Sequence, residues 1–160
     1  MVVAAREEGL NAYHCNAMNE NLMDEIRLAN ISGLLGMTSS DEVNMLTMMQ
    51  YSEILGRDNV YRLLPDVKEL QFKDIMKKYD QGLYLFGKGN SHSYLTTRIN
   101  SGATVKSIKV EKEFNYDSFR KKHGDRAIML AAVSKSKKVS FYTLNQEIKA
   151  EIGDTLLILI

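Results

Sequence analysis

The sequence contains very little cysteine, proline or tryptophan: one, one and none among 160 residues. Cys15 has no second cysteine with which to form an internal disulfide, a pattern typical of proteins from a reducing compartment. The single proline, Pro65, and the lack of any repeat or low-complexity tract argue against long disordered linkers. We also expect Cys15 to be a small buried residue.

Long apolar runs, a signal pattern and a large net charge are missing as well. No stretch approaches the roughly 18 apolar residues that a membrane-spanning helix needs. The N-terminus does not combine a positive segment with an apolar one. We therefore expect this chain itself to be soluble. The formal net charge is only +1, so nucleic acid is not expected as a partner.

The sequence does contain enough apolar residues, 44%, to form the core of one domain or of two small ones. The apolar residues Leu34, Leu35 and Met37 stand next to Gly33 and Gly36 and are typical of a fully buried parallel strand. Ser39 stands three residues before Glu42, which is the spacing of a capping box. A strand that leads directly into a helix predicts half of a βαβ unit, and ligands collect beyond the carboxyl ends of such strands.

Residues 1–66 alternate between helical and strand patterns, which predicts a partial Rossmann-like parallel α/β sheet. The expected helices are 2–8, 19–28 and 40–55, and the expected strands are 11–15, 33–37 and 59–64.

Residues 67–80 are charged with a weak apolar stripe, which predicts a linker helix. Residues 81–160 predict a small α+β domain with paired strands. Its expected strands are 82–87, 104–110, 127–133, 139–144 and 155–160, and its expected helices are 91–100 and 116–123.

A dinucleotide-binding unit normally opens with a strand and a glycine-rich turn, whose backbone N–H groups bind the pyrophosphate. This chain opens with a helix and has no such turn. We therefore expect the glycine-rich first half of the parallel sheet to be absent from this sequence.

Several short motifs carry a resemblance to a known family. Residues 5–17 (AREEGLNAYHCNA) resemble the second part of a TrkA-N domain, also called RCK or KTN, and 38–44 (TSSDEVN) is similar to its Thr-x-x-Asp-Glu-x-Asn turn. Further segments resemble the cytoplasmic tail of bacterial NhaP-type sodium(cation)/proton antiporters: 56–63, 85–87, 113–114 with Phe119, and 153–157.

The resemblance implies a cytosolic regulatory domain of a monovalent cation/proton antiporter, at the cytoplasmic face of the inner (plasma) membrane. It implies a covalently linked transmembrane region as a partner, pairing into a homodimer, and no enzymatic activity. Neither catalytic residues nor a metal site are expected. The nine methionines and an open edge of the partial sheet also favour self-association.

The resemblance further places a cleft for NAD(H) or an adenine nucleotide. Asn16 and Ala17 would meet the adenosine part, and Thr38 would face the phosphates. Asp41 and Asn44 would line the same cleft. The residues alone also allow a purely structural interpretation, in which Asp41 favours the helix N-terminus and Asn44 satisfies a local backbone group.

Two other motifs each allow two interpretations. Gly87 to His92 follows a strand and precedes a helix, like a phosphate-binding turn, but it ends in His92 in place of a third glycine and fits an ordinary turn. The basic runs 120–123 and 135–138 fit either solvated surface or an anion-binding patch.

Two alternative functions stay open at this point. One is a fragment of a nucleotide-dependent oxidoreductase, which would need a catalytic acid or base near the cleft. The other is a free-standing module that senses a ligand and dimerises.

Overall fold

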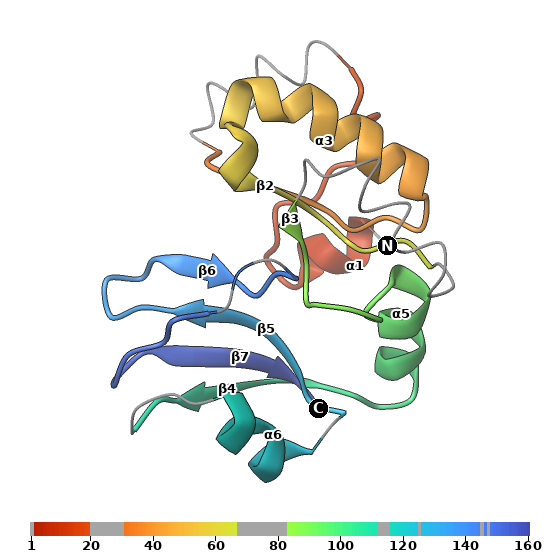
Figure 1. Cartoon of the computed structure of the whole chain (residues 1–160). Coiled ribbons are helices and arrows are strands. Elements are labelled where there is room, and N and C mark those ends of the chain that lie inside the picture. The colour runs from red at the N-terminus through yellow and green to blue at the C-terminus, as the bar shows by residue number, and fades with distance from the viewer. Residues whose placement is uncertain are drawn as a thin grey trace.

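The computed structural model describes residues 2–19, 31–66, 83–111, 116–124, 126–144, 146 and 148–160. These residues form two sheets, one above the other in the view of Figure 1. The first sheet is parallel and the second is antiparallel. The mixed α/β fold class predicted from the sequence is therefore confirmed.

The parallel sheet has the order β1-β2-β3, with β1 Leu34–Gly36, β2 Val60–Arg62 and β3 Leu83–Tyr84. Helix α3 (Asp41–Leu55) connects β1 to β2 and packs over both. A short 3₁₀ turn, η1 (Arg57–Asn59), leads into β2. The predicted strand–helix–strand unit is confirmed, because a parallel pair needs such a crossover.

Strand β1 is less buried than its apolar sequence predicts. Leu34 packs beneath α3, but Leu35 is 40% exposed and Met37 is 39% exposed. Within the described residues β1 is the edge strand, and side chains of successive residues point to opposite faces of a sheet. The prediction of a fully covered strand was wrong because only the α3 side of β1 is covered.

The N-terminal segment agrees with the prediction only in its helix. Helix α1 (Val2–Glu7) ends as expected at Gly9, which has a φ of 77°. Residues 11–15 form no strand, and the Arg6 side chain binds the Ala12 carbonyl instead, at 2.7 Å. A strand needs a neighbour to pair with, and this segment is largely exposed. Cys15 is exposed too, so its expected burial was also wrong.

The antiparallel sheet has the order β4-β7-β5-β6. Its strands are β4 (Val105–Lys109), β5 (Ile128–Val133), β6 (Val139–Phe141) and β7 (Thr155–Leu159), and its helices are α5 (His92–Asn100) and α6 (Tyr116–His123). These strands and helices confirm the expected element types in residues 91–160.

Two apolar clusters cover the two faces of the antiparallel sheet. One cluster contains Met129 of β5, Ile158 of β7 and Phe119 of α6. The other contains Ile128 and Leu159, from the same two strands. The second cluster also contains Leu63, Leu85, Phe86 and Leu95, which come from the ends of β2 and β3 and from α5. The two sheets therefore share a core.

Strand β3 and the residues after it belong to both sheets. The Leu85 N–H donates to the Arg62 carbonyl at 2.8 Å, and the Phe86 N–H donates to the Tyr142 carbonyl at 2.8 Å. The sequence placed Leu83–Tyr84 in a second domain, whereas the structure pairs it with the parallel sheet. The linker helix 67–80 and most of the helix 19–28 lie outside the described residues, so the division into 1–66, 67–80 and 81–160 stays a prediction.

Candidate functional site

The turn from β1 into α3 is held by the side chain of Asn44, which is only 1% exposed. Its Oδ1 accepts from the Thr38 N–H at 2.9 Å and from Thr38 Oγ1 at 2.8 Å, and its Nδ2 donates to the Thr38 carbonyl at 2.9 Å. Two of the predicted site residues are therefore brought together. Asn44 performs the structural role that the sequence allowed as an alternative.

Helix α3 begins one residue later than the predicted capping box. Ser40 is the N-cap, and its Oγ accepts from the Val43 N–H at 3.2 Å and donates to Glu42 at 3.1 Å. Ser39 was the wrong choice because the Thr38 hydroxyl accepts from the Ser40 N–H and fixes the turn one residue further on. Asp41 is then the first helical residue.

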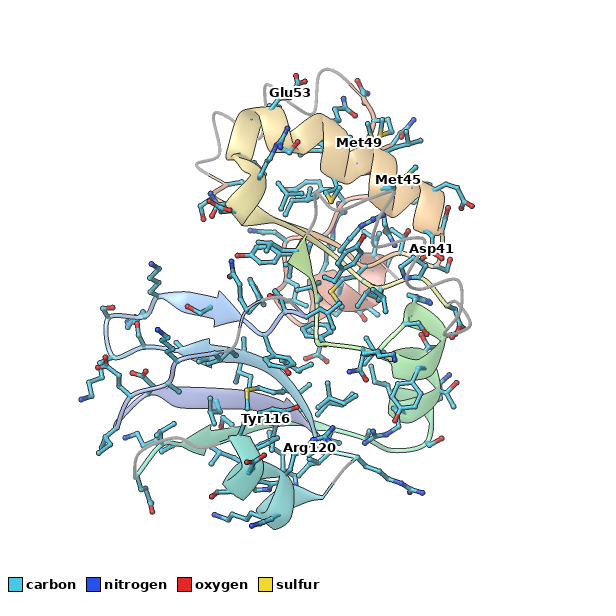
Figure 2. All side chains as sticks on the ribbon, viewed as in Figure 1. Asp41, Met45, Met49, Glu53, Tyr116 and Arg120 are labelled. Carbon is cyan, nitrogen blue, oxygen red and sulfur yellow. The ribbon has the colours of Figure 1, made fainter. Side chains whose placement is uncertain are left out.

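Burial raises the pKa of Asp41, and the neighbouring Glu42 raises it further. Arg62 and the Asp66 backbone N–H counteract this increase. The Asp66 carboxylate adds to it and also accepts from Ser93 of α5 at 2.5 Å. Figure 2 shows Asp41 at the start of α3, with Met45, Met49 and Glu53 further along the helix.

Arg62 is the residue of this edge that the sequence analysis missed. It lies at the carboxyl end of β2, is only 3% exposed, and donates to the Tyr84 hydroxyl at 2.7 Å. Its guanidinium also lies 4.8 Å from the Tyr84 ring centroid. A single arginine between Val60 and Leu63 was the available signal, since a buried cation needs a partner inside the fold.

Asn16 and Ala17 precede Met18, whose sulfur accepts from the Thr47 hydroxyl in the middle of α3 at 3.7 Å. The Ala17 carbonyl accepts from the Tyr51 hydroxyl at 2.7 Å, while Asn16 Oδ1 accepts from the Met18 N–H at 3.0 Å. Tyr51 is ten residues beyond Asp41, or about 15 Å along the helix axis. The structure thus brings Thr38, Asp41 and Asn44 together at one turn, whereas the described hydrogen bonds of Asn16 and Ala17 join them to Met18 and Tyr51.

The edge formed by Thr38, Asp41, Arg62 and Asp66 combines two carboxylates with one guanidinium that already binds a tyrosine. This composition suits polar recognition and charge pairing. In the part of the chain that the structure describes, His, Cys, Asp and Glu side chains do not gather in threes that could hold a metal. None of the described helices combines the length and the apolar character that crossing a bilayer demands.

Residues 1–78 match the family model of the TrkA-N domain. This TrkA-N region contains α1, β1, α3 and β2, and it includes all five predicted site residues. TrkA-N domains are generally regulatory domains of cation transport systems and are typically not catalytic. The resemblance to TrkA-N domains that the sequence motifs indicated is therefore confirmed.

Among solved structures, one that matches is described as "Crystal Structure of the GsuK RCK domain". It is 12% identical and aligns over 94% of this chain with a TM-score of 0.34. This chain spans about a third of that structure's length, 34%. No curated protein matches the sequence.

Proposed function

We propose that this chain is the cytosolic regulatory domain of a monovalent cation/proton antiporter, and that it modulates transport through dimerisation. The observation that carries the proposal is the TrkA-N match over residues 1–78, since such domains regulate cation transport. The antiporter-tail motifs at 56–63 and 153–157 supply the transporter class. The module would act by contacting the transmembrane part differently in its different states.

The outer face of α3 supports the dimerisation part of the proposal. Val43, Leu46 and Met49 recur every three residues on this helix and are 41%, 47% and 58% exposed. An apolar stripe on the side of a helix that faces away from its own sheet is typical of a surface that another protein covers. The α3 stripe, defined by these three residues, would lie in the dimer interface.

Strand β1 adds a second reason to expect pairing. It forms an edge of the described parallel sheet, and Leu35 is exposed on its face opposite α3. An open strand edge presents backbone N–H and C=O groups that can pair with another strand.

The first experiment is to determine the coding sequence that precedes Met1, together with transport by the whole gene product. We expect a series of apolar segments of about 20 residues each. In everted membrane vesicles, removing the codons for 1–160 should change the rate or the pH dependence of cation/proton exchange. An upstream sequence without such segments, or exchange that is identical after the removal, would contradict the proposal.

Nucleotide sensing is the second part of the proposal, and the polar edge at Thr38 and Asp41 supports it. This edge lies beyond the carboxyl ends of β1 and β2, where parallel sheets bind ligands. Calorimetric titration with NADH, NAD, ATP, ADP and AMP tests it. We expect micromolar binding of one of them that Thr38→Ala weakens and Asn100→Ala leaves unchanged. Binding that is equal in both variants would contradict the nucleotide site.

A further inference from the structure

Outside the TrkA-N region, a cavity of about 520 Å³ lies against the antiparallel sheet. It is lined by two motifs that are far apart in the sequence: the turn Gly87–Asn90 and helix α6. Its polar lining includes Lys88, Tyr94, Tyr116, Arg120 and Tyr142. We call it the tyrosine cavity. Its volume lies in the range of about 300–1,000 Å³ that is usual for small-molecule sites.

The turn after β3 gives the cavity its floor. Phe86, Gly87 and Gly89 have φ values of 63°, 78° and 84°, so the chain reverses sharply there. A Cβ on Gly87 would lie 3.1 Å from Cε1 of Tyr142, so the glycine lets the tyrosine ring lie directly on the backbone. The Tyr142 backbone N–H donates to Leu130 of β5 at 2.9 Å and fixes this residue to the sheet.

Aromatic rings form one wall. The rings of Tyr116 and Tyr142 are nearly parallel, with an interplanar angle of 14° and centroids 5.8 Å apart. Tyr116 also stacks on Phe119, with centroids 6.1 Å apart. Figure 2 shows Tyr116 and Arg120 on α6, next to the antiparallel sheet. Such a wall favours a planar ring in the ligand, because stacking on aromatic faces is stabilising.

Two cationic side chains line the cavity. Lys88 comes from the turn and Arg120 from α6. The Arg120 guanidinium lies 5.6 Å from the centroid of the Tyr116 ring. An arginine held against a tyrosine is oriented for planar, bidentate binding of a phosphate, while a lysine supplies a mobile second charge.

We propose that the tyrosine cavity binds a small organic phosphate whose planar ring stacks on the Tyr116–Tyr142 wall and whose phosphate lies between Lys88 and Arg120. This site is separate from the nucleotide site proposed at Thr38. It also gives a shared role to the glycine turn and the basic run, for which the sequence alone allowed an ordinary turn and solvated surface.

Calorimetric titration of the full chain with phenyl phosphate, inorganic phosphate and phenol tests the proposal. We expect phenyl phosphate to bind at least about tenfold more tightly than either of the other two, since each lacks one of the two interactions. Arg120→Gln and Lys88→Gln should each weaken phenyl phosphate binding about tenfold or more. Tyr116→Leu should reduce the preference for phenyl phosphate over inorganic phosphate.

Lys121→Gln is the matched control, because it removes the same charge from α6 at a residue outside the cavity lining. Its affinity should stay within about twofold of the parent. Far-UV circular dichroism checks folding, and Lys88→Gln on the exposed turn decides the test if Arg120→Gln does not fold. Equal losses in Lys121→Gln and Arg120→Gln would overturn the proposal. So would inorganic phosphate binding as tightly as phenyl phosphate, no binding at millimolar ligand, or a loss caused by Thr38→Ala.

Discussion

The two sheets of this chain differ in the length of their strands and in how far their faces and edges are covered. The antiparallel sheet has four strands of up to six residues, and apolar clusters cover both of its faces. The parallel sheet has strands of three, three and two residues, and its β1 edge and the α3 stripe are exposed. Both faces of the antiparallel sheet are covered within this chain, one of them partly by Leu63 and Leu85 from the ends of β2 and β3, whereas the parallel sheet offers surfaces that another chain or segment could cover.

The comparison predicts that the antiparallel sheet dominates the free energy of unfolding. Ile158 has no exposed surface, and Ile158→Ala should reduce this free energy by about 3–4 kcal/mol, through lost apolar burial and the cavity left behind. Urea unfolding measures the effect. Ile152→Ala is the control, because Ile152 is 56% exposed and should change stability by less than about 0.5 kcal/mol. Equal losses in the two variants would contradict the prediction.

A second substitution, Asn44→Ala, tests how much the side-chain hydrogen bonds stabilise the turn from β1 into α3. Asn44→Ala removes three hydrogen bonds to Thr38 and should cost about 2–3 kcal/mol, because each such bond contributes roughly 0.5–1.5 kcal/mol. Hydrogen exchange should show faster exchange around the start of α3 and unchanged protection in β5 and β7. Asn100→Ala, an exposed asparagine in α5, should change neither. Loosening of both sheets together would mean that the turn is not a local feature.

A substitution in the α3 stripe, on the exposed side of the parallel sheet, should weaken self-association and leave folding unchanged. Leu46→Lys places a charge in the α3 stripe and should weaken self-association about 30-fold, because a buried leucine contributes roughly 2 kcal/mol. Sedimentation velocity over a concentration series measures it. Ile99→Lys is the control, because it introduces the same charge at an aliphatic residue of α5 that is 57% exposed and lies outside the α3 stripe. A chain that is monomeric without any substitution would exclude the α3 stripe as a dimer interface.

The free energy of unfolding should be sensitive to one methyl group added at Gly87, where the turn after β3 meets Tyr142. Gly87→Ala should cost about 1–3 kcal/mol from its φ of 78° alone, with an additional cost from the close approach to Tyr142. Gly89→Ala isolates that contact, because Gly89 has a φ of 84° but nothing lies within 4 Å of its added Cβ. In thermal unfolding, the Tm of Gly87→Ala should therefore be lower than the Tm of Gly89→Ala. The reverse order would show that Tyr142 moves aside without cost.

The smallest expected effect is a pH dependence at the edge of the parallel sheet. The pKa of Asp41 is raised above 3.8, so the folded state binds its proton more tightly than the unfolded state does. The stability gained from that proton is fully present below 3.8 and is lost as the pH rises through the raised pKa. Asp41→Asn should therefore gain stability relative to the parent as the pH rises from about 4 to 7. Urea unfolding at several pH values measures this, and a constant difference would contradict it.

The antiparallel sheet could be predicted well because its information is local. The run 104–110 alternates, Gly153 precedes β7, and Gly102 and Gly124 mark where the helices α5 and α6 end. For the same reason Thr38 and Asn44 could be placed at one turn. Residues that lie near each other in the sequence meet through backbone geometry alone, without any knowledge of the tertiary fold.

Most of the mistakes concern residues whose state depends on neighbours that are distant in the sequence, and the N-cap of α3 is the exception. The exposure of Leu35 depends on which strand lies beside β1, and residues 11–15 form no strand for want of a partner. Ser39 and Ser40 are equivalent N-caps in the sequence, and the Thr38 side chain selects Ser40. The importance of Arg62 follows from Tyr84, which lies 22 residues later in the chain.

The segment Tyr84–Phe86 makes backbone hydrogen bonds to both sheets in turn, with the Tyr84 carbonyl accepting from Leu144 and the Leu85 N–H donating to Arg62. A displacement of one sheet can therefore reach the other through three consecutive residues. A shift of Tyr142, which lies on Gly87 and lines the tyrosine cavity, would pull on the strand that holds the Tyr84 hydroxyl against Arg62. The two sheets are thus joined by the backbone hydrogen bonds of Tyr84–Phe86 as well as by their shared core, and we expect a ligand that displaces one sheet to displace the other.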